Sequence, residues 1–532
     1  MSKQEFKNDV EESSRMWASA SFVGVLIIIG MPLWWKTTEV YRVALPYDKI
    51  NAFEPLKHSI ATELNVVVND EATAASVIGE IEKAFADSDI INLKINKQLI
   101  PAALQRTLDY VADEYEAVEE VAKVLELDVH NTFNLVQRKP LFQDVWLGSE
   151  RVMFFRDGKA TPTIIKALMN WVYQTNTLRG ARSDKADAAR RVRFPPGDSY
   201  HVVLSVVHPR PDLMKVEFSA ADAVEDYIGS FVDELSILHN FTLKSQWLHL
   251  LNFDFQAKEM KDGSDWGRHM LVRQDRLPLL LTRLEERAAT HVSERAAINL
   301  ALYVVPCHQA PLVIYDQNDN PLTTPVQAFM SPKWGGVVLA SPSAEDCAAD
   351  QPRYKPDVRA IMGAFVSQLR KLLGITELEY IEGAYLDPLK SVMPRQWEID
   401  NLLRIRTLEQ LTSAERTLQS LAQLLGEISN IVINDEVGAS INSAVDEMSV
   451  ARSLCGAARR LAGAHGAARR ALGAAETAFT EPSLLALLYF PDDQKYAIYI
   501  PLFLPIMFPV VLSLKNLILW FRGKPAAKEK TE

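Results

Sequence analysis

Two long apolar runs, one near each end of the chain, constrain the fold of this sequence more than any other feature. The first, residues 16–35 (MWASASFVGVLIIIGMPLWW), carries no charged side chain, and the second, residues 497–520, carries only Lys515. An α-helix needs about 20 residues to cross the hydrocarbon core of a bilayer. We therefore predict transmembrane helices at 16–35 and 497–520. A cleaved signal peptide is the alternative for the first run, but its shorter apolar core would precede small residues rather than Trp-Trp-Lys at 34–36.

The second apolar run contains a proline at every fourth position. Pro501, Pro505 and Pro509 fall near one face of a helix, and each lacks the backbone N–H that an α-helix uses. Carbonyl groups freed in this way need partners inside a membrane. The spacing favours a bent helix packed against helices of other proteins, and a proline-rich helix without such neighbours is the alternative.

The charges beside the second run predict the orientation of both helices. The tail at 521–532 is basic, with Arg522, Lys524, Lys528 and Lys530 against Glu529 and Glu532. The positive-inside rule places this tail in the cytosol, and a second crossing places the tail at 1–15 there too. We therefore expect the acidic region between the helices to face the lumen of the secretory pathway.

Two short motifs agree with that location. Asn240-Phe241-Thr242 is an acceptor sequence for N-glycosylation, so Asn240 is predicted to carry a glycan added in the lumen. Lys528 and Lys530 lie fifth and third from the end of the chain, as in a dilysine signal for retrieval to the endoplasmic reticulum. A basic tail that only fixes the orientation of the helix is the alternative. These features predict a two-pass protein of the endoplasmic-reticulum membrane with both termini in the cytosol.

Charge and cysteine content exclude some functions. The net charge of −11, from 57 basic and 68 acidic residues, argues against nucleic-acid binding, which needs clustered Lys and Arg. Three cysteines, Cys307, Cys347 and Cys455, are too few for a disulfide framework and form no CxxC motif for zinc. A lumenal location would permit a disulfide between Cys307 and Cys347, and three buried, unreactive thiols are the alternative.

The region between the apolar runs shows the alternation typical of an α/β fold. Short apolar runs predict strands at 64–68, 152–156, 201–207, 301–305 and 312–315. Apolar residues at helical spacing predict helices at 75–85, 104–125, 163–173, 220–238 and 357–373. We therefore expect a lumenal α/β domain at 36–395.

The composition changes after Arg395. Apolar residues recur three and four apart at 397–431, and an alanine-rich stretch follows at 441–478. These two stretches predict a helical hairpin within a lumenal helical segment at 396–480. A juxtamembrane segment at 481–496 then leads into the second apolar run.

The sequence shows no recognisable catalytic machinery. It contains no GxSxG, HExxH, phosphate-loop or GxGxxG motif. Cys307 and His308 are neighbours, but adjacent side chains in a strand point to opposite faces, which argues against a catalytic pair. Asp87-Ser88-Asp89 has the DxD spacing of a metal-binding pair but lies in an ordinary polar turn after a predicted helix. We therefore expect no catalytic residue, no metal site and no cofactor.

The turn from Ser331 to Gly336 (SPKWGG) enters an apolar strand. Its paired glycines allow another backbone to approach closely. Trp334 could anchor a partner protein, but a tryptophan in such a turn more often closes the edge of a core, so packing is the favoured interpretation.

Several ordered blocks of this sequence resemble the PIG-S family. The likeness is diffuse at about 69–160, and Asn240 lies where the family also has an NF[ST] sequon. The blocks that carry the resemblance are long and unusual in composition: GMPLWWKTTE at 30–39 followed by Tyr41-Arg42, the turn at 331–336, the helical stretch at 421–433, and the entry to the second span from Pro482 through YFPDDQK at 489–495.

This resemblance implies a function. PIG-S is a non-catalytic membrane subunit of the endoplasmic-reticulum GPI transamidase, which replaces the hydrophobic C-terminal signal of a proprotein with a preformed GPI lipid. In that complex a caspase-like PIG-K subunit supplies a Cys/His dyad and forms a thioester, beside PIG-T, PIG-U and a GPAA-type subunit. We expect this chain to support assembly and to position substrate and GPI. The alternative is a membrane-anchored lumenal hydrolase or glycosyltransferase with an unrecognised site.

Overall fold

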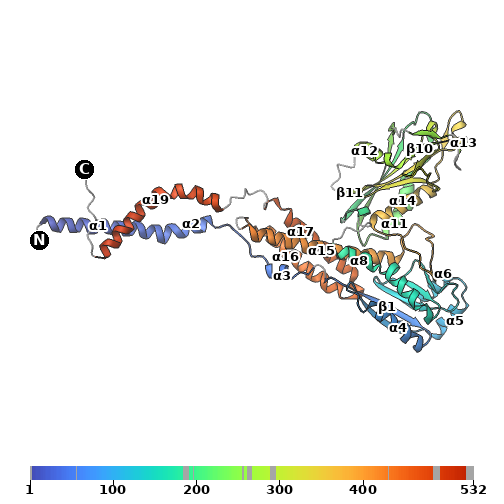
Figure 1. Ribbon diagram of the computed structural model, residues 1–532, viewed down its shortest axis with the longest axis horizontal. Coiled ribbons are helices and arrows are strands. Elements are labelled where there is room, and N and C mark those ends of the chain that lie inside the picture. The colour runs from blue at the N-terminus through green and yellow to red at the C-terminus, as the bar shows by residue number, and fades with distance from the viewer. Residues whose placement is uncertain are drawn as a thin grey trace. The chain divides into compact units, whose positions relative to one another are not determined.

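The chain divides into two compact units (Figure 1). Unit 1 comprises residues 1–53, 416–445 and 473–532, and unit 2 comprises 54–415 and 446–472. The computed structural model describes residues 3–54, 57–183, 191–195, 197–253, 257–260, 267–287, 295–428, 431–482, 484 and 492–522.

The first half of unit 2 is built on a six-stranded sheet in the order β16-β4-β5-β3-β1-β2. Strands β2, β1, β3 and β5 run parallel, and β4 runs antiparallel to β5. Strands β3 and β5 are buried along their whole length, as expected for parallel strands with helices on both faces. The strand bounds are β1 (Ile60–Val68), β2 (Ile91–Leu99), β3 (Thr132–Gln137), β4 (Val145–Leu147), β5 (Val152–Phe155) and β16 (Ala384–Leu386).

Helices cover this sheet. On one side, α4 (Glu71–Phe85) begins at Asp70, whose carboxylate accepts a hydrogen bond from the Thr73 N–H, and it packs against α7 (Thr161–Ala167). The single helix predicted at 104–125 is wrong. Two helices occupy that stretch, α5 (Ala102–Tyr110) and α6 (Glu114–Ala122), because Asp113 caps the start of a new helix through the Tyr115 N–H.

The second half of unit 2 contains a five-stranded sheet in the order β13-β14-β11-β6-β8. Strands β8, β6, β11 and β14 are parallel, and β13 is antiparallel to β14. In Figure 1, α14 and α11 lie beside this sheet, next to β11. The bounds are β6 (Ser199–His208), β8 (Asn240–His249), β11 (Ala296–Val304), β13 (Gln327–Ser331), β14 (Gly335–Ala340), α10 (Ala220–Ala223), α11 (Ser230–Asp233) and α14 (Val358–Leu373).

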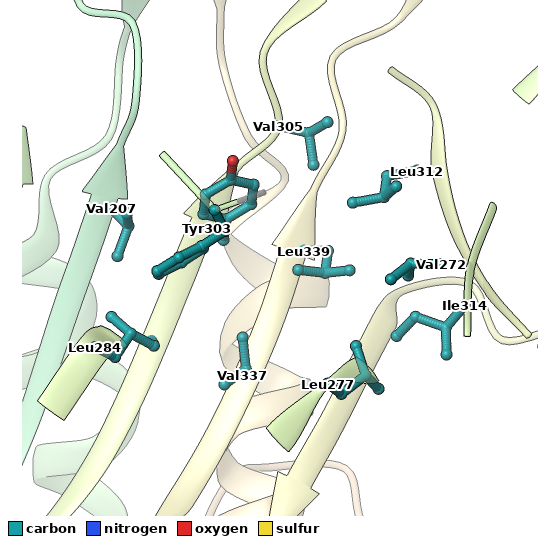
Figure 2. Packing of buried hydrophobic residues seen from close by; sticks show 12 residues of the cluster. Val207, Val272, Leu277, Leu284, Tyr303, Val305, Leu312, Ile314, Val337 and Leu339 are labelled. Carbon is teal, nitrogen blue, oxygen red and sulfur yellow. The ribbon is translucent and has the colours of Figure 1, made fainter. Parts of the chain in front are cut away.

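The other face of the second sheet is covered by a small sheet and a helix. The small sheet has the order β12-β10-β9, and α12 (Pro278–Arg287) packs beside it. Figure 2 shows the shared core, in which Leu339 of the large sheet lies toward Val272 and Leu312 of the small sheet. The small strands are β9 (Lys258–Met260), β10 (His269–Arg273) and β12 (Leu312–Tyr315).

The two halves of unit 2 share one topology. In each half, the first strand in the chain lies between the second and the third. The fourth strand lies at the edge of this set and pairs antiparallel with the fifth. The order β2-β1-β3-β5-β4 therefore matches β8-β6-β11-β14-β13. Strands β5 and β14 occupy matching positions, and each precedes a helix: α7 follows β5, and α14 follows β14. Unit 2 is therefore a structural duplication, which the sequence analysis did not predict.

The helical segment contains three helices rather than the predicted hairpin of two. They are α15 (Gln396–Glu427), α16 (Asp435–Cys455) and α17 (Leu461–Phe479). The alanine-rich stretch is broken after Cys455, where Gly456 and a single 3₁₀ turn (η9, Ala458–Arg460) separate α16 from α17. Glycine lowers helix propensity, which is consistent with a break at this position.

In the part of α15 that belongs to unit 2, buried carboxylates pair with arginines that precede strands in both halves. Asp400 accepts hydrogen bonds from Nε and Nη2 of Arg151, which directly precedes β5, at 2.7 and 3.0 Å. Glu409 pairs with Arg193, which precedes β6, at 3.0 Å. Because these charges are buried and paired, they fix the helix against both sheets. The carboxyl ends of the strands are left free of α15.

Unit 1 contains the apolar ends of the chain. Its amino-terminal helix runs through α1 (Lys3–Val25), a π-helical turn η1 (Leu26–Gly30) and α2 (Met31–Thr38). A short helix, α3 (Tyr47–Asn51), follows, and α19 (Asp492–Phe521) holds the three prolines near the other end.

Candidate functional site

One apolar segment of unit 1 has the length and composition of a membrane-crossing helix, and a second, bent segment has them if its two parts form one span. The segment Met16–Lys36 is long and apolar enough to cross a membrane by length and composition. Ala497–Pro505 and Met507–Phe521 meet that criterion as a pair bent by 54°. The bend follows Pro505, where the missing N–H interrupts the helical hydrogen bonds.

The two apolar segments contact each other through aromatic and small side chains. The Trp34 ring lies edge-on to those of Tyr499 and Phe503, with centroids 6.3 and 5.9 Å away. The hydroxyls of Ser19 and Ser513 are 3.5 Å apart. Small residues let helices approach closely in a bilayer, and aromatic rings favour its interface, so the two segments form one paired element.

Directly after the first apolar segment, the chain is fastened to the ends of two helices. We call this contact the clasp: Tyr41–Val43 on one side and residues 425–438 on the other. The N–H of Ile433 donates to the Tyr41 carbonyl and the N–H of Val43 donates to the Ile433 carbonyl, both at 3.1 Å. Gly438 completes the clasp, because an added Cβ would lie 2.9 Å from Cγ1 of Val43.

The charges of the clasp match the helix ends that they contact. Arg42 donates to the carbonyl oxygens of Leu425 and Ile428 at the carboxyl end of α15, where free carbonyls attract a cation. The Tyr41 hydroxyl donates to Asp435 Oδ1 at 3.0 Å, and this hydrogen bond raises the pKa of Tyr41. Asp435 lies in the first turn of α16, where a carboxylate is favoured. Residues from both sides of the clasp belong to the blocks that resemble the PIG-S family, but the sequence does not predict that these blocks meet.

The structure describes some of the predicted site residues. Asn240 is exposed at the start of β8, an edge strand, and Thr242 of its sequon is half-buried. Lys528 and Lys530 lie outside the described residues, as do 483 and 485–491 of the juxtamembrane segment at 481–496.

Cys307 and Cys347 form a disulfide with their Cα atoms 5.6 Å apart. Cys307 and His308 lie in a 3₁₀ turn, η8 (Cys307–Gln309), so the strand assumed for them in the sequence analysis is wrong. The sulfur of Cys307 is bonded and is not a free nucleophile. The remaining thiol, Cys455, is buried, and burial raises its pKa to about 12, which leaves it unreactive.

Side chains of the DxD triplet at 87–89 form ion pairs and hydrogen bonds with other residues of the protein. Asp89 forms ion pairs with Arg182 and Arg179, and the hydrogen bond from Arg182 lowers its pKa. The Ser88 hydroxyl accepts the Ile91 N–H at 3.2 Å. Within the described part of the chain, no group of three or more His, Cys, Asp or Glu side chains could hold a metal ion.

The turn at 331–336 serves packing. Trp334 packs against the core cluster shown in Figure 2. A Cβ on Gly335 would lie 1.7 Å from the backbone oxygen of Asn299, and one on Gly336 would lie 1.9 Å from Oε1 of Gln368. The glycine pair therefore lets β14 pair with β11 and α14 pack on it.

Known proteins resemble this chain along its whole length. A family model described as "PIG-S: Phosphatidylinositol-glycan biosynthesis class S protein" matches residues 21–524. The "GPI-anchor transamidase component PIGS" of Bos taurus is 31% identical over 554 residues, covering 98% of both chains. The Homo sapiens protein of that name is 31% identical and covers 97% of both. The "GPI transamidase component PIG-S homolog" of Schizosaccharomyces pombe is 22% identical over 93% of this chain and 82% of its own. This chain belongs to the PIG-S family.

Proposed function

We propose that this chain is a non-catalytic subunit of the GPI transamidase in the endoplasmic-reticulum membrane. The observation that carries the proposal is the family match at 21–524, which includes most of the first apolar segment, the clasp, both α/β halves and the described part of α19. The relatives are named as components of that enzyme. A match over one domain would support a shared fold, whereas this match covers the membrane segments together with the globular region.

The role that fits these features is to hold the globular region at the membrane. The paired apolar segments provide the anchor, and the clasp begins five residues after the first of them ends at Lys36. An anchored scaffold raises the effective concentration of reactants that meet beside the bilayer without chemistry of its own. The reactants here are the GPI lipid and the apolar tail of a proprotein.

In this proposal the chemistry belongs to another subunit, a caspase-like PIG-K with a Cys/His dyad, and PIG-T, PIG-U and a GPAA-type subunit complete the complex. Two features of this chain support the division of labour. The thiol of Cys307 is committed to a disulfide, and Asp89 of the DxD triplet is committed to two arginines. A lumenal hydrolase or glycosyltransferase is not favoured, since its best candidate residues are engaged in these ways.

The proposed orientation has both tails in the cytosol and residues 36–496 in the lumen. The exposed Asn240 provides the test. Endoglycosidase H should increase the gel mobility of the full chain expressed in cells, and Asn240→Gln should abolish that change. A protease added to sealed microsomes should remove a tag at either terminus and leave the globular region intact. A protected terminal tag would contradict the orientation.

The subunit role is tested by deletion and rescue. Cells that lack this chain should lose GPI-anchored proteins from their surface, and the wild-type chain should restore them. Affinity purification of the tagged chain from detergent-solubilised membranes, followed by mass spectrometry, should recover a PIG-K-type subunit. Normal surface levels in its absence, together with a purified chain free of that subunit, would contradict the proposal.

A further inference from the structure

The duplicated topology of unit 2 creates two equivalent crevices. In each half the chain moves from the first strand to a neighbour on one side and then to a neighbour on the other, so the crevice lies between β1 and β3 in the first half and between β6 and β11 in the second. In open α/β sheets, ligands bind at this switch point, beyond the carboxyl ends of the strands. The two crevices of this chain differ in what occupies them.

The crevice of the first half is filled by the protein itself. The Gln137 side chain accepts a hydrogen bond from the Asn69 N–H at 3.0 Å and so bridges the ends of β3 and β1. Arg138 is buried beside it and donates to the carbonyl oxygens of Leu108 and Val111 and to Glu114. Protein groups therefore engage Gln137 and Arg138 in this crevice, and Oδ1 of Asn69 is left without a partner among the described residues.

The crevice of the second half holds a cavity of about 360 Å³. His208 is the last residue of β6, and Arg210 follows it. Val304 is the last residue of β11, and His308 follows it. The cavity therefore lies at the switch point. Leu213, Met214 and several prolines give it a mainly apolar lining. The volume falls within the range of about 300–1,000 Å³ that is typical of small-molecule pockets.

Two cross-links fix the walls of this cavity. The Cys307–Cys347 disulfide joins the wall after β11 to helix α13 (Ala344–Ala348), directly before the lining residues Ala349 and Asp350. Strand β7 (Lys215–Val216) follows the wall after β6 and pairs with β15 (Arg353–Tyr354), with Lys215 N–H bonded to the Pro352 carbonyl at 2.9 Å. The loops around the cavity are therefore held in place without a ligand, which reduces the entropy lost on binding.

The cavity contains a buried polar group without a partner. His208 is only 3% exposed, and its Nδ1 has no hydrogen-bond partner among the described residues. Burial, aided by the nearby His249, lowers the pKa of His208, so the imidazole is neutral at physiological pH. A buried polar atom left unpaired destabilises the protein, and a hydrogen bond to a ligand would recover that loss.

Arg210 supplies a cation at the same cavity. Its Nε and Nη2 donate to Asp212 at 2.8–3.3 Å, while Nη1 has no partner among the interactions of the described residues. Arg210 is exposed, so its side chain is accessible to an incoming ligand. Asp350, another exposed lining residue, disfavours an anion beside it. His208 and Arg210 are lining residues that can donate hydrogen bonds to an anion.

We propose that this cavity binds an apolar carboxylate, whose carboxylate group accepts hydrogen bonds from Nδ1 of His208 and Nη1 of Arg210 and whose apolar body lies against Leu213 and Met214. The ligand chemistry is shared by a free organic acid and by the C-terminal residue of a peptide. This site is independent of the transamidase role.

The test uses the full-length chain in nanodiscs and isothermal titration calorimetry. The probes are phenylpropionate for a free acid and acetyl-Gly-Phe for a peptide terminus, each compared with its uncharged amide. At least one carboxylate should bind, and its amide should bind at least about tenfold more weakly, a difference of 1.4 kcal/mol. The carboxylate that binds more tightly identifies the source.

Two variants and a control locate the site. Arg210→Met and His208→Phe should each weaken carboxylate binding at least about tenfold, an affinity change of 1.4 kcal/mol. Arg268→Met should leave binding unchanged, because Arg268 forms a similar exposed ion pair, with Glu259, away from the cavity. Arg210 is exposed, so its replacement tests the site even where His208→Phe affects folding. Absence of binding by both carboxylates, equal binding of the amides, or binding unaffected by Arg210→Met would overturn the proposal.

Discussion

The guanidinium of Arg42 donates a hydrogen bond to the main-chain carbonyl oxygen of Leu425, in the last turn of α15. This contact joins the residues after the first apolar segment to a helix end almost four hundred positions later, with a sequence separation of 383. Arg42 also donates to the Ile428 carbonyl at 3.4 Å, so one side chain binds two carbonyl groups at this helix end.

Replacing Arg42 by methionine should therefore loosen the clasp. A hydrogen bond from a charged group contributes about 1.5–3 kcal/mol, so Arg42→Met should lower the free energy of unfolding of unit 1 by roughly this amount. Limited proteolysis of the detergent-solubilised chain should then cut faster within 425–438. Arg273→Met, which removes an exposed ion pair with Asp319, is the control and should leave the pattern unchanged. Equal cleavage of both variants would contradict the role of the clasp.

Asp400→Asn should destabilise unit 2 strongly. Asp400 is 2% exposed and neutralises Arg151, which is equally buried, so the variant leaves a buried cation without its counter-charge. Breaking a buried pair in this way costs about 3–5 kcal/mol. Asp319→Asn, in an exposed pair with Arg273, should cost less than about 1 kcal/mol. Thermal unfolding of both purified variants makes the comparison, and similar losses would show that the buried pair is not important for stability.

The stability of unit 2 should fall as the solution is acidified. Burial lowers the pKa of His239 to about 3, and burial with repulsion from Arg469 and Arg406 lowers that of His465 to about 4. The ordinary histidine value of about 6.5 applies in the unfolded chain, which therefore binds more protons between these limits. Stability should be complete above about pH 6.5 and decline towards pH 4.

The matched variant for this prediction is His465→Leu, which removes one titrating group from the core. Its unfolding temperature should depend less steeply on pH between about 6.5 and 4 than that of the wild type. His308→Gln, at an exposed position, should keep the wild-type slope. If the unfolding temperature depended equally on pH in all three proteins, groups other than His465 would cause the acid sensitivity.

The disulfide predicts a particular pattern of thiol labelling. In the folded chain, a maleimide reagent should modify no cysteine, because Cys307 and Cys347 are bonded and Cys455 is buried. After mild reduction it should modify Cys307 and Cys347, and only denaturation should add Cys455. Mass spectrometry of the peptides reads out each step. Labelling of Cys307 without a reductant would show that the bond is absent in the cellular protein.

Adding one methyl group at Gly335 should be more harmful than at other glycines. Its Cβ would lie 1.7 Å from the Asn299 oxygen, a backbone atom, and its φ of +151° is rarely adopted by other residues. Gly335→Ala should therefore separate β14 from β11 and unfold the second half of unit 2. Gly363→Ala is the control, since nothing lies within 4 Å of its Cβ and alanine favours the helix by up to about 1 kcal/mol. Equal unfolding temperatures would contradict this packing.

The sequence predicts the α/β class because its local patterns agree with the fold. The apolar run at 64–68 lies within β1, and the helical pattern at 357–373 coincides with α14. Helix breaks were missed where one polar residue decides them: Asp113 starts a new helix within an otherwise periodic stretch. Local periodicity also gives no information on the pairing order of strands, so the duplication appears only in three dimensions.

The functional contacts were less predictable for the same reason. Tyr41 and Asp435 are 394 positions apart, and each is an ordinary polar residue in its own segment. Buried charges such as Asp400 resemble solvated helix residues in the sequence, because only the sheet around them shows that they are enclosed. Nothing in the sequence around His208 distinguishes it from an ordinary histidine, because its unpaired Nδ1 becomes visible only with the cavity beside it.

The most direct test of the central claim is purification of the tagged chain from solubilised membranes of cells that depend on it for surface GPI-anchored proteins. The account predicts that wild type and Arg273→Met both recover a PIG-K-type subunit and restore surface display. Arg42→Met should do both less well, because the residues after the first apolar segment are no longer fastened to the end of α15. A chain that restores surface display without that subunit, or that purifies alone from cells with normal display, would contradict the assignment to the GPI transamidase.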